Sequence, residues 1–260
     1  MINRRGFMGA LGGIGMLASS GLAGAAPEKR RVFVLEEYYF KNGTQPGRFD
    51  EYVTKGALPA LSKVHTGPKI FLTALAAPHM PQTAVIMGFQ SVEELWAVRE
   101  KITTNPEITK ALEAWEDHPE QPYEHFSTSL LEATPYCPEV TADPEPRKTS
   151  RIFELRTYHS PTWRQLKALH ERFAGPEIKI FHRVGVNPIL YTSTVLGPNM
   201  PNLTYVIPFE SLAAREKAWD AFGADPEWIK VRKESIDRHG QISSVIQISL
   251  YRATAYSPIR

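Results

Sequence analysis

The chain carries one pattern of hydrophobic and polar positions twice, at a spacing of 120 residues. Residues 31–38 are Arg-Val-Phe-Val-Leu-Glu-Glu-Tyr, and residues 151–158 are Arg-Ile-Phe-Glu-Leu-Arg-Thr-Tyr. Both stretches alternate β-branched, aromatic and charged residues, which is typical of a strand. At the same spacing, Asn-Pro-Glu at 105–107 recurs as Asp-Pro-Glu at 225–227. We interpret the chain as an internal duplication of a unit of about 105 residues, the size of a domain.

Each copy predicts the same order of elements. Strands are expected at 31–40, 69–76, 83–90 and 124–134 in the first copy and at 151–158, 189–196, 203–209 and 243–254 in the second. A helix is predicted over 49–64, and its counterpart begins at Pro161 and ends near Phe173, before a Gly-Pro pair. Ser91 and Glu94 form a capping box that begins a further helix. The order β-α-β-β-α-β is that of the ferredoxin-like fold.

The first strand of the second copy predicts how the two copies pack. Alternation puts Glu154 and Arg156 on one face of the sheet, together with Ile152 and Tyr158, and Phe153 on the other face. Neither face is fully polar, so both must be covered. Helices cover one face, and the other copy is the simplest cover for the second. We therefore predict an α+β protein in which two tandem repeats pack sheet to sheet as an intrachain barrel.

The first 25 residues resemble an export signal. Arg4 and Arg5 precede a Gly/Ala-rich apolar stretch, and Ala25 ends a small-x-small cleavage site. This pattern predicts a twin-arginine signal and a periplasmic or otherwise exported protein, without contact to the membrane once the signal is removed. An uncleaved N-terminal anchor is the alternative, although glycines and serines weaken the stretch.

Charge and cysteine usage narrow the choice of partners. The 30 basic and 28 acidic residues nearly balance, and no basic run is present, which argues against nucleic acid as a partner. Cys137 is the single cysteine, so no internal disulfide can form.

We place the first repeat at 31–136, a Pro- and acid-rich linker at 137–150 and the second repeat at 151–256. Whether the chain forms a homo-oligomer stays open.

Short motifs in the second copy resemble the NIPSNAP family. They are Ile-Phe-Glu-Leu-Arg-Thr-Tyr at 152–158, Phe-Glu-Ser-Leu at 209–212 with Arg215, and Asp-Pro-Glu-Trp at 225–228. The first copy follows more loosely, with Val34, Glu36 and Ile108 where the motifs have Glu, Arg and Trp. The family belongs to the dimeric α+β barrel superfamily, which implies paired ferredoxin-like units. NIPSNAP proteins share no agreed reaction. Related barrels include cofactor-free monooxygenases, haem-binding enzymes and proteins that bind small apolar compounds.

The charged residues of the first strands are the leading site candidates, because the chain lacks the common catalytic motifs. Glu36 and Arg156 stand at equivalent positions, so a pseudo-twofold axis between the copies would bring them together as an ion pair or as ligand contacts. Glu154 could share Arg156. The hydroxyl groups of Tyr38 and Tyr158 could serve as donors in a pocket, or could be satisfied within the core.

Histidines and aromatic–arginine pairs are the remaining candidates. His65 and His182 end the first helix of each copy and could face the space between helix and sheet, with Arg183 beside His182, whereas His170 is expected to face water. The pairs Trp96–Arg99 and Trp219–Arg215 lie within one helical turn. Such pairs could hold a planar ligand by stacking or belong to ordinary helix-on-sheet packing.

Together these patterns favour an exported protein that binds a small, partly apolar or planar ligand between sheet and helices. Cofactor-free, oxygenase-like activity is one extension of this hypothesis. The alternative is a non-enzymatic interaction module, and a haem-binding enzyme is a third option. No residue pattern requires a cofactor or predicts a metal site, and the catalytic residues stay unknown.

Overall fold

The computed structural model describes residues 31–143 and 147–260. The predicted signal, with Arg4, Arg5 and Ala25, lies outside these residues. The first half contains β1 (Val32–Tyr39), α1 (Gln45–Tyr52), η1 (Val53–Ala57), α2 (Leu58–Val64), β2 (Lys69–Ala76), β3 (Gln82–Phe89), α3 (Val92–Thr104), α4 (Pro106–Glu116) and β4 (His125–Ala133). The second half contains β5 (Ile152–His159), α5 (Trp163–Arg172), η2 (Phe173–Glu177), α6 (Ile178–Arg183), β6 (Leu190–Leu196), β7 (Asn202–Phe209), α7 (Leu212–Ala224), α8 (Pro226–His239) and β8 (Val245–Ala253).

The helices begin at the capping residues that the sequence offers. The Ser91 hydroxyl accepts a hydrogen bond from the Glu94 amide at 3.3 Å. Asn105 and Asp225 accept two amide hydrogen bonds each at the starts of α4 and α8, where a proline stands at the first helical position. These local bonds fix the helix starts in both halves at the same spacing.

The first helix of each half contains a π-helical turn, η1 or η2. The predicted end of the second-half helix near Phe173 is confirmed, because α5 ends at Arg172 and a kink at Gly175 separates it from α6. Proline removes one backbone donor and disfavours a helical conformation at the residue before it, and Gly175 directly before Pro176 has a non-helical backbone. The first-half helix begins at Gln45, four residues before the prediction.

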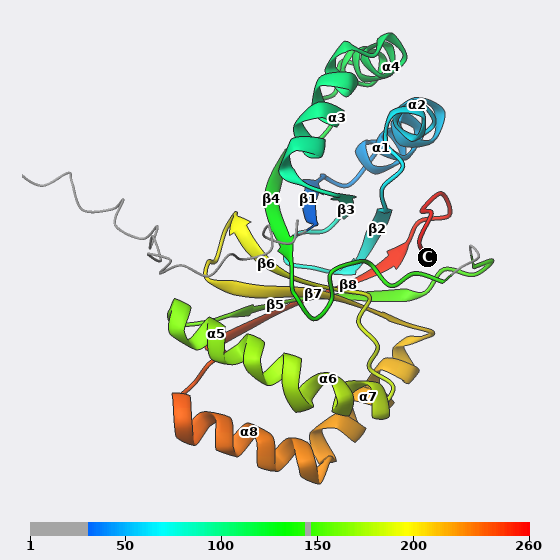
Figure 1. The fold of residues 1–260 in the computed structure, drawn as a ribbon. Coiled ribbons are helices and arrows are strands. Elements are labelled where there is room, and N and C mark those ends of the chain that lie inside the picture. Colours follow the sequence, from blue (N-terminus) through cyan, green and yellow to red (C-terminus); the bar gives the residue numbers. More distant parts are fainter. Residues whose placement is uncertain (1–30, 144–146) are drawn as a thin grey trace, which may run out of the picture.

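The eight strands form one closed barrel in the order β1-β3-β2-β8-β5-β7-β6-β4. Two antiparallel seams join the halves: β2 pairs with β8, and β4 pairs with β6. Figure 1 shows the helices of the first half on one side of the barrel and those of the second half on the opposite side. The prediction that each half covers the bare sheet face of the other is confirmed in this closed arrangement. Among the described residues, no helix is long and apolar enough to cross a membrane.

The barrel interior is an apolar core shared by both halves. Phe33 and Leu35 from β1 meet Phe153 and Leu155 from β5 there, with Tyr251 from β8. Alternation then places Glu36 and Arg156 on the outer, helix-covered face. The predicted pairing of Glu36 with Arg156 is wrong, because the barrel lies between the two faces that carry them.

Candidate functional site

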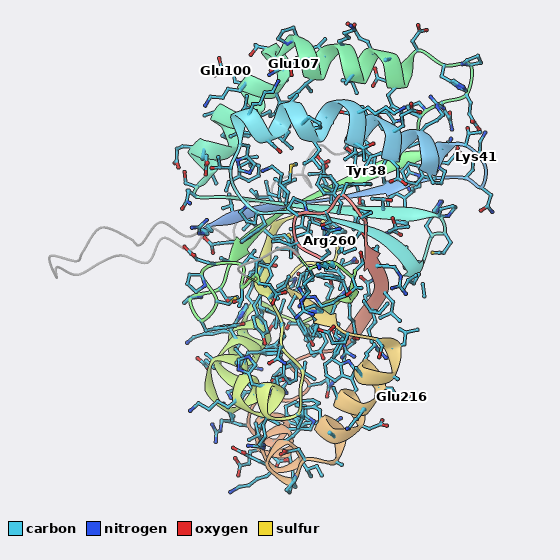
Figure 2. The ribbon with its side chains drawn as sticks, turned by 90° about the vertical axis from the view of Figure 1, so that its right-hand side faces the viewer. Tyr38, Lys41, Glu100, Glu107, Glu216 and Arg260 are labelled. Carbon is cyan, nitrogen blue, oxygen red and sulfur yellow. The ribbon has the colours of Figure 1, made fainter. Side chains whose placement is uncertain are left out.

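A cavity of about 210 Å³ lies between the sheet and the helices of the first half. Strands β1 to β3 form its floor, and α1, η1, α2, α3 and α4 form its walls. The lining residues are Glu36, Tyr38, Phe49, Tyr52, Val53, Ala57, Leu58, Leu61, Phe71, Val85, Met87, Ile102 and Ile108. Figure 2 shows Tyr38 between the barrel and these helices. The lining is therefore apolar except for one carboxylate and two phenols.

Glu36 is the single charged residue in this lining. The Tyr38 hydroxyl donates a hydrogen bond to Oε2 at 2.9 Å, and the described residues offer the carboxylate no second hydrogen bond. Burial raises the pKa of Glu36, while the Tyr38 bond and the attraction of Arg99 oppose the rise. The carboxylate thus has an oxygen, Oε1, without a hydrogen bond beside an apolar cavity.

Aromatic rings hold the two phenols in place. The Tyr38 ring lies 4.7 Å from Phe49 and 5.4 Å from Phe126, measured between centroids. Tyr52 stacks on Trp115 at 4.5 Å with nearly parallel planes. Burial and the nearby Glu36 raise the pKa of Tyr52 to about 12, so its phenol stays protonated at neutral pH. Both hydroxyl groups can therefore act as hydrogen-bond donors.

The equivalent space of the second half contains a network of charged and aromatic side chains. Glu154 is fully buried and forms ion pairs with Arg156 and Arg215. The indole Nε1 of Trp219 donates to Glu154 Oε2 at 3.1 Å. The Arg156 guanidinium lies 3.6 Å from the centre of the Trp219 ring and donates to the Tyr158 hydroxyl at 3.1 Å. Glu154 thus pairs with Arg156 but does not share it with Glu36.

Comparing positions 120 residues apart explains why the first half is hollow. Where the second half has Phe173, Glu177, Phe181, Tyr205 and Trp228, the first half has Val53, Ala57, Leu61, Val85 and Ile108. All five first-half residues line the cavity. All five second-half residues have the larger side chain, and four are almost completely buried. Because protein interiors are close-packed, smaller side chains on the same backbone frame leave a void.

The charges also differ between the halves. Glu36 stands at the position of Arg156, and Val34 at the position of Glu154. Leu95 replaces Arg215, so the first half lacks both arginines that neutralise the buried carboxylate of the second half. Arg99 replaces Trp219, but its side chain is exposed and packs over Trp96 at 5.7 Å.

The other predicted site residues do not converge on this cavity. His65 is buried and stacks on Phe89 at 4.6 Å, outside the lining. Trp96 is 59% exposed, so the pair Trp96–Arg99 lies on the surface. His182 is exposed and lines a different cleft. Arg183 forms exposed ion pairs with Asp225 and Glu227.

The prediction that His170 faces water is wrong. The His170 ring is half-buried, with Nδ1 2.8 Å from the Tyr136 hydroxyl and Nε2 2.8 Å from Ser193 Oγ. These partners come from the segment after β4 and from β6, which only the closed barrel brings beside α5.

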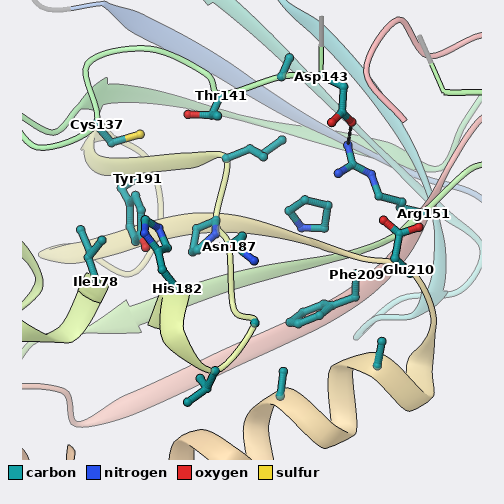
Figure 3. Close-up of a pocket in the computed structure, with 18 of the residues that line it drawn as sticks. Cys137, Thr141, Asp143, Arg151, Ile178, His182, Asn187, Tyr191, Phe209 and Glu210 are labelled. Atoms are coloured by element: carbon teal, nitrogen blue, oxygen red, sulfur yellow. Dashed lines mark ion pairs between the residues drawn. The ribbon is translucent and has the colours of Figure 1, made fainter. Parts of the chain in front are cut away.

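A second, more polar cleft of about 710 Å³ lies between the linker and the second half. Figure 3 shows Arg151 and Asp143 on one side, joined by an ion pair of 3.1 Å, and Cys137, Tyr191 and His182 on the other. Burial raises the pKa of the Cys137 thiol, and its Sγ donates a hydrogen bond to the Glu139 carbonyl. A raised pKa keeps the thiol protonated and therefore unreactive. Sequence reasoning missed this cleft because its residues come from several segments that are far apart in the sequence.

The described lining of the first-half cavity offers no cluster of metal ligands and no histidine or cysteine for a haem iron. Among the described residues, no group of three or more His, Cys, Asp and Glu side chains could hold a metal ion. The cavity lining contains no histidine or cysteine for a haem iron. An engineered cavity of about 150 Å³ holds one benzene ring, so about 210 Å³ has room for a single-ring compound.

The NIPSNAP family model matches residues 153–258. The second half is a NIPSNAP domain. This match agrees with the resemblance carried by the motifs at 152–158 and 225–228, and it leaves the cavity-bearing first half outside the matched range. No match to a curated protein was found. The NIPSNAP domain is thus the half whose helix–sheet space contains the buried ion network.

Solved structures share the fold of the whole chain at low sequence identity. An anthrone oxidase-like protein is 13% identical, with a TM-score of 0.52, over 87% of this chain and 92% of its own. A monooxygenase-like protein from Fusobacterium nucleatum is 10% identical, with a TM-score of 0.56, over 86% of this chain and 92% of its own. At these identities the likeness shows the fold alone, an α+β barrel with an antiparallel sheet.

Proposed function

We propose that this protein binds a small, partly apolar ligand in the helix–sheet cavity of its first half. The observation that carries the proposal is the difference between the halves: five side chains of the NIPSNAP domain have smaller counterparts in the first half, around a single, partly buried carboxylate. A cavity costs stability. A concave apolar site with a few polar groups is the usual form of a small-molecule site.

The two halves then have separate roles. We interpret them as tandem ferredoxin-like repeats, of which the second supports the barrel through its buried ion network and the first holds the ligand. A non-enzymatic interaction module is the alternative, and it would be favoured by filled helix–sheet spaces in both halves. The open cavity in the first half supports ligand binding instead.

An oxygenase-like reaction without a cofactor is a second candidate for the same site. Glu36 is a partly buried carboxylate with a raised pKa, a property suited to accepting a proton from a bound substrate. The similarity to an anthrone oxidase-like and a monooxygenase-like barrel supports this candidate only at the level of fold. Oxygen uptake on addition of a bound ligand would test the reaction.

We also propose that the chain is exported through its twin-arginine signal.

Filling the cavity tests the binding proposal. Val85→Tyr introduces the residue that the NIPSNAP domain has at the equivalent position, Tyr205, and should occupy the cavity. Single-ring compounds (toluene, phenol, indole and benzylamine) are screened against both proteins by saturation-transfer NMR. We expect at least one compound to bind the unsubstituted protein and to lose binding in Val85→Tyr.

Val195→Tyr is the matched control, because Val195 is an exposed valine on a strand, β6, outside the cavity. This variant should bind the same compounds as the unsubstituted protein. If no compound binds the unsubstituted protein, or if Val85→Tyr binds as well as the control, the cavity is not a ligand site.

A further inference from the structure

Both halves hold a carboxylate on the outer face of the sheet, fully buried in Glu154 and partly buried in Glu36, but only Glu154 forms ion pairs. In the NIPSNAP domain, Glu154 forms ion pairs with Arg156 and Arg215. A buried charge needs a partner of opposite sign, because transfer out of water is otherwise costly. In the first half, Glu36 has no arginine, lysine or histidine in its cavity lining. The one cation that acts on Glu36 through its charge is Arg99, which is exposed and outside the lining, so the cavity itself offers the carboxylate no cation.

The cavity has the other features that favour a cation. Tyr38, Phe49, Tyr52 and Phe71 bring four aromatic rings to the lining beside the carboxylate. Aromatic faces attract ammonium groups through their quadrupole, and the attraction grows when water is excluded. The second half uses the same chemistry internally, since the Arg156 guanidinium lies 3.6 Å from the Trp219 ring centre.

We propose that the ligand of the first-half cavity is a compact ammonium compound, whose charged nitrogen pairs with Glu36 Oε1 and whose apolar body lies against the aromatic rings. This inference rests on the proposed binding function and names its ligand class. The ligand cation takes the place that Arg156 and Arg215 have beside Glu154 in the NIPSNAP domain.

The cavity volume sets the size of the ligand. The cavity has a volume of about 210 Å³, whereas roughly 150 Å³ holds benzene. The difference leaves room for a few more heavy atoms. A single ring bearing an aminomethyl group is of this size, so benzylamine is a suitable probe. Benzyl alcohol and toluene have nearly the same shape and serve as the neutral donor and the hydrocarbon.

Binding of the ammonium probe should depend on the ionisation of Glu36. The groups that act on this carboxylate are Tyr38 on β1, Tyr52 on α1 and Arg99 on α3. Tyr52 stays protonated over the working range, since its pKa is raised to about 12. Burial raises the pKa of Glu36, and an ammonium ligand needs the ionised form. Benzylamine affinity should therefore rise with pH through the pKa of Glu36, while toluene affinity stays constant.

The test measures the affinities of the three probes by NMR titration of the protein without its signal. We expect benzylamine to bind at least about tenfold more tightly than benzyl alcohol, because a hydrogen bond to a buried charge is strong. Glu36→Gln should lose about 10- to 100-fold in benzylamine affinity and keep its toluene affinity. Glu100→Gln, on the exposed face of α3, is the matched control and should leave all three affinities unchanged.

The outcomes separate this inference from the proposed function. If benzyl alcohol or toluene binds as tightly as benzylamine in the unsubstituted protein, the ammonium proposal is overturned while ligand binding stands. If none of the three probes binds, the proposed function fails as well. Should Glu36→Gln not fold, the probe ranking and its pH dependence in the unsubstituted protein still decide the question.

Discussion

At the scale of single residues, Glu36 and Glu154 show how neighbours determine the role of a buried carboxylate. Glu154 accepts hydrogen bonds from Arg156, Arg215 and the Trp219 indole, and the two arginines neutralise its charge within the protein. Glu36 accepts one hydrogen bond from Tyr38 and is left with a free oxygen. A buried ion pair is weak evidence for added stability, but a buried charge without a partner is costly. The same chemical group is thus structural in one half and available to a ligand in the other.

Glu177, which is fully buried like Glu154, predicts how stability depends on pH. Burial raises its pKa to about 7 from the ordinary 4.5, although Arg172 donates to it at 2.6 Å. The folded state therefore holds a proton on Glu177 that the unfolded state loses near pH 4.5. The protonated Glu177 therefore contributes about 3 kcal/mol to the free energy of unfolding below pH 4.5, and this contribution is lost as pH rises to 7.

Urea unfolding from pH 4 to pH 8 measures this contribution. The free energy of unfolding should fall with pH more steeply in the unsubstituted protein than in Glu177→Gln, which cannot titrate at this position. Glu36 and Glu37, whose pKa values burial also raises, remain in both proteins and cancel in the comparison. Parallel pH profiles for the two proteins would contradict the assignment.

At the scale of elements, the helix α1-η1-α2 approaches α4 closely. A side chain at Gly56 would place its Cβ 2.2 Å from the Cβ of Ala111, far inside van der Waals contact. Gly56 lies in the π-helical turn η1, which widens the helix at the point of contact. Two small residues, glycine and alanine, therefore fix the spacing of the helices that wall the cavity.

Gly56→Ala should destabilise the protein by about 1–3 kcal/mol, because the two helices must separate. The control is Gly223→Ala, in α7, where a new Cβ meets nothing within 4 Å. That substitution should stabilise by about 0.5–1 kcal/mol through helix propensity. Thermal and urea unfolding measure both variants, and equal effects would show that the Gly56 contact is not tight.

At the scale of the whole molecule, the barrel makes the two halves depend on each other. Each half alone would expose its inner sheet face, including Phe33 and Leu35 or Phe153 and Leu155. It would also leave two strand edges unpaired, which are β2 and β4 in the first half and β8 and β6 in the second. Exposed apolar faces and free edges promote association.

The isolated second half, residues 147–260, should therefore self-associate rather than remain a monomer. Sedimentation velocity over a range of concentrations measures the association. Mixing it with residues 26–143 should give a one-to-one complex through the seams β2–β8 and β4–β6. A folded, monomeric second half at high concentration would contradict the dependence that the barrel implies.

Much of the fold followed from local patterns. Alternation at 31–38 and 151–158 predicted the strands and their two faces, and capping residues such as Ser91 and Asn105 predicted helix starts. The end predicted near Phe173 was also right, because Gly175 leaves the helical conformation directly before Pro176. His170 was misplaced because its partners, Tyr136 and Ser193, are far away in sequence.

The sequence by itself determined the duplication, the order of strands and helices, and the residues that can carry charge, because these depend on local periodicity and on residues 120 positions apart. Only the tertiary structure decided which face of each sheet meets the helices, and thus that Glu36 and Arg156 lie on opposite sides of the barrel. It also decided that Val53, Ala57 and Val85 surround a cavity. Cavities and ion pairs arise from packing in three dimensions, which local patterns do not encode.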